Sequence, residues 1–182
     1  VASHGQTIFH QPERKFTLQI GHGAAIKSTL NVPVISDFRS QDVILGGQGA
    51  PLVPIGDELL FAEFDACLNL GGFSNISMNR NGNRIAFDIS PVNLVLKHFA
   101  NQLGFDFDEN GQHASRGKLN STLFETLNKL DYYQRACTKS LGFESVDKIY
   151  LPLINAFKLS SEDVLHTFTQ HIVHQTKKIV NE

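Results

Sequence analysis

The sequence lacks tryptophan and has one methionine and only two cysteines among its 182 residues. Two cysteines cannot build the disulfide framework of small secreted domains, so Cys67 and Cys137 fit a reducing compartment. We expect both thiols to be structural, with Cys67 a small buried residue of a strand. The eight histidines do not stand at zinc-ligand spacing from the cysteines, so the pattern predicts no zinc site.

The sequence also lacks an excess of positive or negative charge, and it lacks a long hydrophobic run. The 16 basic and 18 acidic residues leave a formal net charge of −2, which excludes the basic footprint of a nucleic-acid-binding protein. The sequence has no apolar run long enough to cross a bilayer and no signal-peptide pattern. We therefore expect a cytoplasmic protein with neither nucleic acid nor membrane as a partner.

The composition is that of a globular protein, and the hydrophobic pattern changes along the chain. A length of 182 residues suits one domain or slightly more. Strand-type runs come early, at Phe16–Ile20, Val32–Ile35, Ala66–Leu70, Ser74–Asn79 and Arg84–Asp88. Helical patterns are found at Ala24–Leu30, Pro91–Leu103, the centre of Gly111–Gly117, Leu119–Leu130 and beyond Ser160. This order predicts an α/β or α+β fold with an antiparallel hairpin.

Local signals predict several element boundaries. Asn79–Asn83 has the asparagine and glycine of a hairpin connection. Pro91 suits a first helical turn, and Gly104 suits the end of that helix. Ser160 is a predicted N-cap for a last helix. That helix carries one apolar stripe, which we expect to pack in the core, at Val164, Leu165, Phe168, Ile172, Thr176 and Ile179.

The richest run of the chain is Asp37–Leu52, which combines two acidic residues, an arginine and three glycines. It lies in a predicted long loop, Arg39–Pro54, and loops of that length are usually functional or disordered. Asp42 could serve as a general base or metal ligand, or it could pair with Arg39 or cap an amide. Asp37 and Arg39 could form an ion pair, or Arg39 could bind a substrate carboxylate.

Two further motifs are weaker by themselves. His4-Gly-Gln-Thr7 follows Val1-Ala-Ser, which has the pattern of a strand end, and a lone histidine is more often structural. Asn69-Leu-Gly71-Gly72-Phe-Ser-Asn75 places a turn of small residues after a strand, where backbone amides can reach phosphates.

Together these motifs resemble the anhydro-N-acetylmuramic acid kinase family of the actin/sugar-kinase/Hsp70 ATPase superfamily. The resemblance covers about His4 to Ile76 most specifically and continues to about Lys118. It implies a ribonuclease-H-like lobe with a mixed sheet and flanking helices. Residues 1–182 would form one incomplete lobe, with a sugar and catalytic part at 1–65 and a phosphate-turn and helical part at 66–182. The resemblance also implies a segment of a longer protein that lacks the first lobe, which would be its partner.

The resemblance implies a reaction and a role for each motif. The family cleaves the 1,6-anhydro ring of the sugar with water and phosphorylates O6 with ATP, in peptidoglycan recycling. Asp42 occupies the place of the general base. Residues implied to bind the amino sugar are His4, Gln6, Thr7, Asp37, Arg39, Gly47, Gln48 and Gly49. Residues implied to contact ATP are Gly71, Gly72, Asn75, Asp88 and Asn93. Phosphoryl transfer needs Mg²⁺, whose ligands the sequence does not identify. The family also forms homodimers, which the motifs leave open here.

Two motifs depart from the family pattern. The smaller departure is Gly21-His22-Gly23, where an acidic residue often follows the first glycine. Asp88-Ile-Ser-Pro-Val-Asn93 has Ser90 and Val92 where typical members have glycine, and a β-branched valine resists positive φ. An alternative is therefore a catalytically silent lobe that binds a sugar or a partner. A further alternative is another sugar or acyl-carrier kinase, although such kinases need no hydrolytic water.

Overall fold

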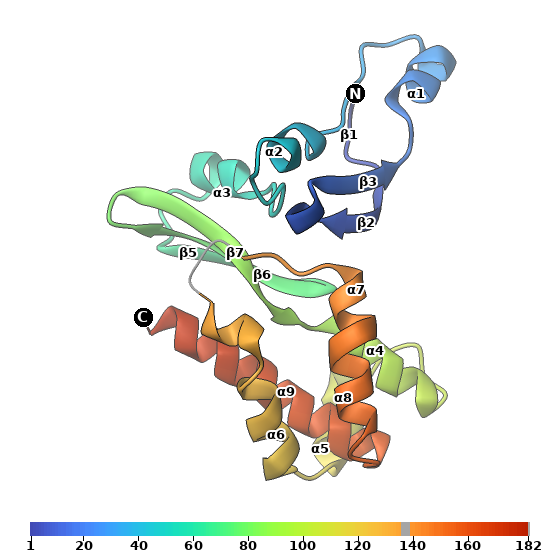
Figure 1. Cartoon of the computed structure of the whole chain (residues 1–182), viewed down its shortest axis with the longest axis vertical. Helices are drawn as coiled ribbons and strands as arrows, with labels where there is room; N and C mark the ends of the chain where they lie inside the picture. Colours follow the sequence, from blue (N-terminus) through green and yellow to red (C-terminus); the bar gives the residue numbers. More distant parts are fainter. Residues whose placement is uncertain (136–138, 182) are drawn as a thin grey trace.

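The computed structural model describes residues 1–135 and 139–181 (Figure 1). Its strands form three small sheets. β1 (Ala2–Ser3) pairs with β4 (Ile35–Ser36) in parallel, and β2 (Gln6–Gln11) pairs with β3 (Phe16–Ile20) antiparallel. The third sheet is antiparallel and has the order β5-β6-β7. Its strands span Ala66–Leu70, Phe73–Arg80 and Asn83–Pro91. The chain is thus a mixed α/β structure, which confirms the coarse fold class.

Helices accompany every part of the chain. The N-terminal part carries η1 (Pro12–Arg14), α1 (Gly23–Leu30), α2 (Ser40–Ile44) and α3 (Pro54–Leu60). After β7 come α4 (Asn93–Gln102), η2 (Glu109–Gly111), α5 (Gln112–Arg116), α6 (Ser121–Asn128) and η3 (Asp131–Gln134). The last elements are α7 (Phe143–Ser145), the π-helix η4 (Val146–Tyr150), α8 (Leu151–Asn155) and α9 (Ser161–Val180). Figure 1 shows the helices α4–α9 together on one side of the third sheet, with β1–β4, α1 and α2 on the other.

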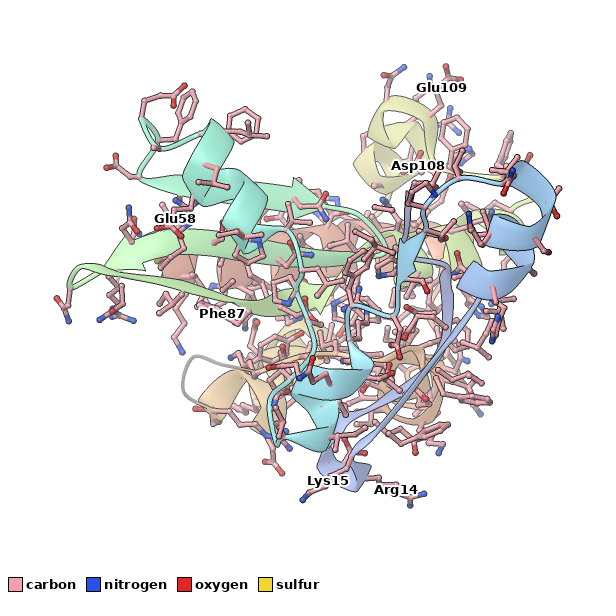
Figure 2. All side chains as sticks on the ribbon, turned by 90° about the horizontal axis from the view of Figure 1, so that it is seen from above. Arg14, Lys15, Glu58, Phe87, Asp108 and Glu109 are labelled. Carbon is pink, nitrogen blue, oxygen red and sulfur yellow. The ribbon has the colours of Figure 1, made fainter. Side chains whose placement is uncertain are left out.

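The predicted hairpin connection is confirmed between β6 and β7. Asn81 and Gly82 both have positive φ, 53° and 79°, which suits the twist of a tight hairpin. Both strands run further than the sequence pattern predicts, because the pairing continues from Arg80↔Asn83 to Phe73↔Pro91. A register shift after Ser74 places Asn75 opposite Asp88. Figure 2 shows the separate hairpin β2–β3, with Arg14 and Lys15 pointing outward at its tip.

α9 organises the core as predicted. The hydroxyl oxygen of Ser160 accepts a hydrogen bond from the Asp163 amide at 3.1 Å, which confirms the N-cap. The first part of the predicted stripe is buried, at Val164, Leu165, Phe168 and Ile172. These side chains pack with buried residues of α4, α6, η3, η4 and α8 in one cluster. A second, small cluster consists of Ile76 of β6 with Phe87 and Ile89 of β7, and Ile179 of α9 packs against it. The helical half therefore holds nearly all of the core.

Three boundary predictions are wrong. The strand predicted at Val32–Ile35 is only the two-residue β4, because the two preceding residues make no ladder with β1. The predicted loop Arg39–Pro54 contains α2, whose first amide, that of Ser40, donates to the side chain of Asp37 just before the loop. Pro91 ends β7 instead of opening a helix, and α4 begins at Asn93. In each case a tertiary pairing or a local cap outweighs the sequence pattern.

The cysteine predictions have different outcomes. Cys67 lies in β5 as predicted, but it is only half-buried, and its sulfur accepts a hydrogen bond from Arg84 at 3.4 Å. Cys137 lies outside the described residues. Among the helices that the structure describes, none is long and apolar enough to cross a membrane.

Candidate functional site

The candidate catalytic run begins with a capped helix. Asp37 has a φ of 60°, and its Oδ1 accepts a hydrogen bond from the Ser40 amide at 3.2 Å. This bond satisfies one of the free amides at the start of α2. The helix then carries Asp42 on its exposed side and turns Val43 inward, where it is fully buried. The role of Asp37 in the structure is therefore to start the helix that presents Asp42.

The glycines after α2 hold the Asp42 carboxylate. The Gly49 amide donates a hydrogen bond to Asp42 Oδ2 at 2.6 Å. A Cβ at Gly47 would collide with the same carboxylate, so a side chain there would displace Asp42 from this position. Gly49 has a φ of 62°, and a Cβ there would collide with the side chain of Val43. The two glycines thus hold the carboxylate in one position. Of the alternatives considered for Asp42, the structure shows the one in which it caps a backbone amide, that of Gly49.

Arg39 fixes the other side of the same loop. Its Nη1 donates to the Gly49 carbonyl, and its Nε donates to His4 Nε2 at 3.0 Å. His4 Nδ1 lies 2.9 Å from the Gly5 carbonyl and can donate to it. Arg39 is thus bound to His4 and to the loop, and the alternative ion pair with Asp37 is absent between these two described side chains.

The remaining predicted sugar residues lie beside this group. Gln6 and Thr7 are in β2, directly after Gly5, and Gln19 reaches the Thr7 hydroxyl at 3.5 Å. Gln48 lies in the glycine loop, and its Oε1 accepts a hydrogen bond from the Ser140 hydroxyl at 2.9 Å. The Gln48–Ser140 bond joins the loop to a segment 92 residues further along the chain.

Asp88 is buried under that distant segment. Its Oδ2 accepts from the Leu141 amide at 2.8 Å, and its backbone carbonyl accepts from the Tyr132 hydroxyl at 2.6 Å. Burial raises the pKa of Asp88 to about 6, while the Leu141 amide and the charge of Arg39 act in the opposite direction. The charges of Asp88 and Arg39 therefore interact. This interaction connects the predicted nucleotide motif, which contains Asp88, with the loop that carries Asp42.

The predicted phosphate turn packs against the start of α4. The Val92 and Asn93 amides donate to the carbonyls of Gly72 and Gly71, at 2.9 and 3.2 Å. The Gly71 amide donates to Phe73 within the turn, at 3.0 Å. Gly72 and Asn93 are exposed, and Asn75 is half-buried.

Ser90 and Val92, which replace the glycines of the family pattern, are both accommodated in the buried part of the fold. Ser90 is fully buried, and its hydroxyl donates to the Pro91 carbonyl at 3.0 Å. Val92 is buried in the main core and has a φ of −130°, so its β-branched side chain needs no left-handed backbone.

A cavity of about 1010 Å³ adjoins the glycine loop. Gly46 and Gln48 line it on one side, and the end of β2 with η1 lines another. The other walls come from α6–η3 and from residues 139–150 with α7 and η4. The volume is that of a small-molecule site. Sequence reasoning missed these walls, since His10 carried no usable signal and residues 139–150 had no motif.

The chain was compared with known proteins. The sequence model of the family described as anhydro-N-acetylmuramic acid kinase matches residues 1–182. A relative of that name from Pseudomonas fluorescens is 44% identical, over 79% of this chain and 41% of its own length. Relatives of the same name from Clostridioides difficile and Shewanella denitrificans are 38% and 36% identical, over 93% and 100% of this chain and 48% and 52% of their lengths. The chain spans about half the length of these curated relatives. With a match along all its residues, the chain belongs to the anhydro-N-acetylmuramic acid kinase family.

Proposed function

We propose that the full-length protein containing this chain is a kinase that opens 1,6-anhydro-N-acetylmuramic acid with water and phosphorylates its O6 with ATP. The observation that carries the proposal is the Asp42 carboxylate, fixed by the Gly49 amide at 2.6 Å on the exposed side of α2. A base needs such a defined position with room for a water molecule beside it. The names of the curated relatives support the same activity.

In this proposal Asp42 takes a proton from the water that attacks the anomeric carbon. The C1–O6 bond of the anhydro ring breaks, and the released O6 accepts the γ-phosphoryl group of ATP, leaving ADP. Asp42 Oδ2 is engaged with Gly49, so its second oxygen is the one that orients the water. His4 and Arg39 fix the loop, and Gln6, Thr7, Asp37, Gly47 and Gln48 complete the sugar side.

The nucleotide side is proposed at the turn Gly71–Gly72, with Asn75 and Asn93. Gly72 and Asn93 are exposed, and a turn of small residues suits close approach of phosphate oxygens. Asp88 would support this site indirectly, because its buried carboxylate accepts a hydrogen bond from the Leu141 amide and so positions that segment. Mg²⁺ is usually bound through one or two carboxylates and substrate phosphates. No group of three metal-ligating side chains occurs in the described part of the chain, so we place its ligands on ATP and on the remainder of the protein.

We further propose that residues 1–182 are one incomplete ribonuclease-H-like lobe, with a sugar part at 1–65 and a phosphate and helical part at 66–182. The missing lobe would cover the N-terminal half. The structure describes every residue from 1 to 70, and in this range Val43 is the only fully buried hydrophobic side chain. Large apolar side chains are exposed there, including Ile8, Phe9, Phe16, Ile35, Ile44, Leu45, Ile55, Leu59, Leu60 and Phe64. A homodimer is compatible with the same surface.

The test is ADP release by the full-length protein with ATP, Mg²⁺ and 1,6-anhydro-N-acetylmuramic acid. We expect release that depends on the sugar. Asp42→Asn should reduce turnover by about 10²-fold or more while sugar binding stays within a few-fold. Full turnover by Asp42→Asn would show that Asp42 is not the general base.

A second candidate is a catalytically silent lobe of the same fold. It is favoured by the burial of Asp88, Ser90 and Val92, which leaves this loop with no exposed carboxylate for a nucleotide. This candidate predicts a folded full-length protein that binds the sugar and releases no ADP in the same assay.

A further inference from the structure

A short segment of the helical part contacts the glycine loop that holds the Asp42 carboxylate. This segment comprises residues 139–145, and we call it the linking segment. Its Ser140 hydroxyl donates a hydrogen bond to Gln48 Oε1 at 2.9 Å. Gln48 directly precedes Gly49, whose amide donates to the Asp42 carboxylate. The position of the linking segment therefore bears on the position of the proposed base.

The same segment also lies against β2. Glu144 Oε1 accepts a hydrogen bond from the Gln11 side chain at 3.3 Å. A Cβ at Gly142 would lie 2.9 Å from the His10 carbonyl oxygen, so the two backbones are in close contact there. The N-terminal part is thus joined to the linking segment at two places, the glycine loop and β2.

The other side of the linking segment is fixed by Asp88. The Asp88 amide donates to the Lys139 carbonyl at 3.0 Å, and Asp88 Oδ2 accepts from the Leu141 amide at 2.8 Å. Leu141 is buried in the main core, and Lys139 is buried as well. Ser140 therefore lies between two hydrogen bonds to one residue of the predicted nucleotide motif, and its side chain reaches the glycine loop.

These contacts connect the two parts that the proposed reaction must align. The O6 released on the sugar side has to meet the γ-phosphoryl group on the nucleotide side, and a misplacement of 1 Å can cost about 10²-fold in rate. The N-terminal part buries little apolar surface of its own, with Val43 as its only fully buried hydrophobic side chain. Its alignment with the Asp88 motif therefore depends on specific contacts such as those of the linking segment.

We propose that Ser140, Gly142 and Glu144 are positioning residues, which hold the glycine loop and β2 in a fixed placement relative to the Asp88 motif. The inference rests on the proposed function, because it concerns the alignment of the proposed sugar side with the proposed nucleotide side. Each part keeps the residues that bind its own ligand when this contact is weakened. The expected signature is a lower kcat with unchanged KM for the sugar and for ATP.

The first experiment compares two serine variants of the full-length protein. Ser140→Ala removes the hydrogen bond to Gln48, and we expect kcat to fall by about tenfold, less than a displacement of 1 Å can cost. Both KM values should stay within about twofold. The matched control is Ser115→Ala, which removes a hydroxyl that donates at 2.8 Å to the Gln112 carbonyl inside the helical part. This control should leave kcat and both KM values within about twofold.

Two further changes test the contact with β2. Gly142→Ala introduces a methyl group against the His10 carbonyl without removing a hydrogen-bonding side chain, and it should also lower kcat by about tenfold. Glu144→Gln keeps an oxygen that can accept from Gln11, whereas Glu144→Ala does not. The glutamine variant should therefore lose less kcat than the alanine variant.

Hydrogen exchange of the full-length protein gives a measurement that does not depend on turnover. In Ser140→Ala the amides of residues 46–49 should exchange about fivefold faster than in wild type, as expected for the loss of one neutral hydrogen bond, and Ser115→Ala should match wild type. Unchanged kcat and unchanged exchange in Ser140→Ala would overturn the inference, and sugar-dependent ADP release would then leave the proposed function standing.

A rise in KM for one substrate alone would also overturn the inference, because it would place Ser140 in that substrate's binding site. If wild type releases no ADP but Ser140→Ala accelerates exchange in the glycine loop selectively, the linkage stands and the proposed function fails.

Discussion

At the scale of single residues, the candidate site depends on glycines, which have no side chain to fill the space beside Asp42. Gly47 leaves space for the Asp42 carboxylate, and Gly49 supplies the amide that holds it. Arg39 also acts on the backbone of this loop, because its guanidinium donates to the Gly49 carbonyl. Small changes in this loop should therefore affect Asp42 before they affect the rest of the fold.

Gly47→Ala tests this dependence. The added methyl group would collide with the Asp42 carboxylate, so that one of them must move. We expect kcat of the full-length protein to fall by about 10²-fold, the lower range for loss of a positioned base, with little change in KM. Gly56→Ala in α3 is the matched control, because a Cβ there meets open space. Equal losses in both variants, or none in Gly47→Ala, would contradict the assignment.

Asp88 gives a pH-dependent prediction. Its pKa rises from the usual 3.8 to about 6 on folding, so the folded state holds the proton more tightly than the unfolded state. The protonated acid favours folding at low pH, and this contribution is lost as the pH rises through about 6. Asp88→Asn keeps an acceptor for the Leu141 amide without the charge. Relative to wild type, its free energy of unfolding should increase by about 2 kcal/mol between pH 4 and pH 8.

Urea unfolding of wild type and Asp88→Asn at pH 4, 6 and 8 measures this difference. A constant difference across the three pH values would show that Asp88 ionises in the fold as it does in the unfolded chain.

At the scale of elements, the sequence predicted structure best where a pattern is local. The β6–β7 connection is determined by Asn81 and Gly82, and the start of α9 by Ser160. α2 escaped prediction because it has five residues and depends on a cap from Asp37 outside the helix. The cavity walls were not predicted because Gln11 and Glu144, which are 133 residues apart in the sequence, meet only in the tertiary structure.

The α9 cap can be tested by Ser160→Ala. The mutation removes the oxygen that accepts the Asp163 amide and should lower the free energy of unfolding by about 1 kcal/mol. Ser28→Ala is a suitable control, since Ser28 is exposed within α1 and its hydroxyl donates to the carbonyl of Ala25, three residues earlier in the same helix. Thermal or urea unfolding that gives the same value for both variants would show that this cap does not stabilise α9.

At the scale of the whole molecule, burial is divided unequally. The helical half packs α9 against a continuous core, with Leu123, Leu127, Val164, Leu165 and Phe168 at most 2% exposed. The hairpin β2–β3 instead exposes Phe9, Phe16, Leu18 and Ile20 to between 40% and 54%. Since buried apolar area supplies most of the stability of a domain, the two halves should differ strongly in local stability.

Hydrogen exchange can measure this difference directly. In the chain of 182 residues, amides of β2 and β3 should exchange rapidly while those of the buried face of α9 stay protected, because local opening of the hairpin exposes little additional apolar surface. In the full-length protein, the remaining half of the polypeptide should cover Phe9, Phe16 and Ile20, and the hairpin amides should gain protection of about 10²-fold or more, as burying several such side chains contributes a few kcal/mol. Protection of α9 should change much less. If the hairpin exchanges at the same rate in both proteins, its apolar face is not the surface on which the two lobes meet.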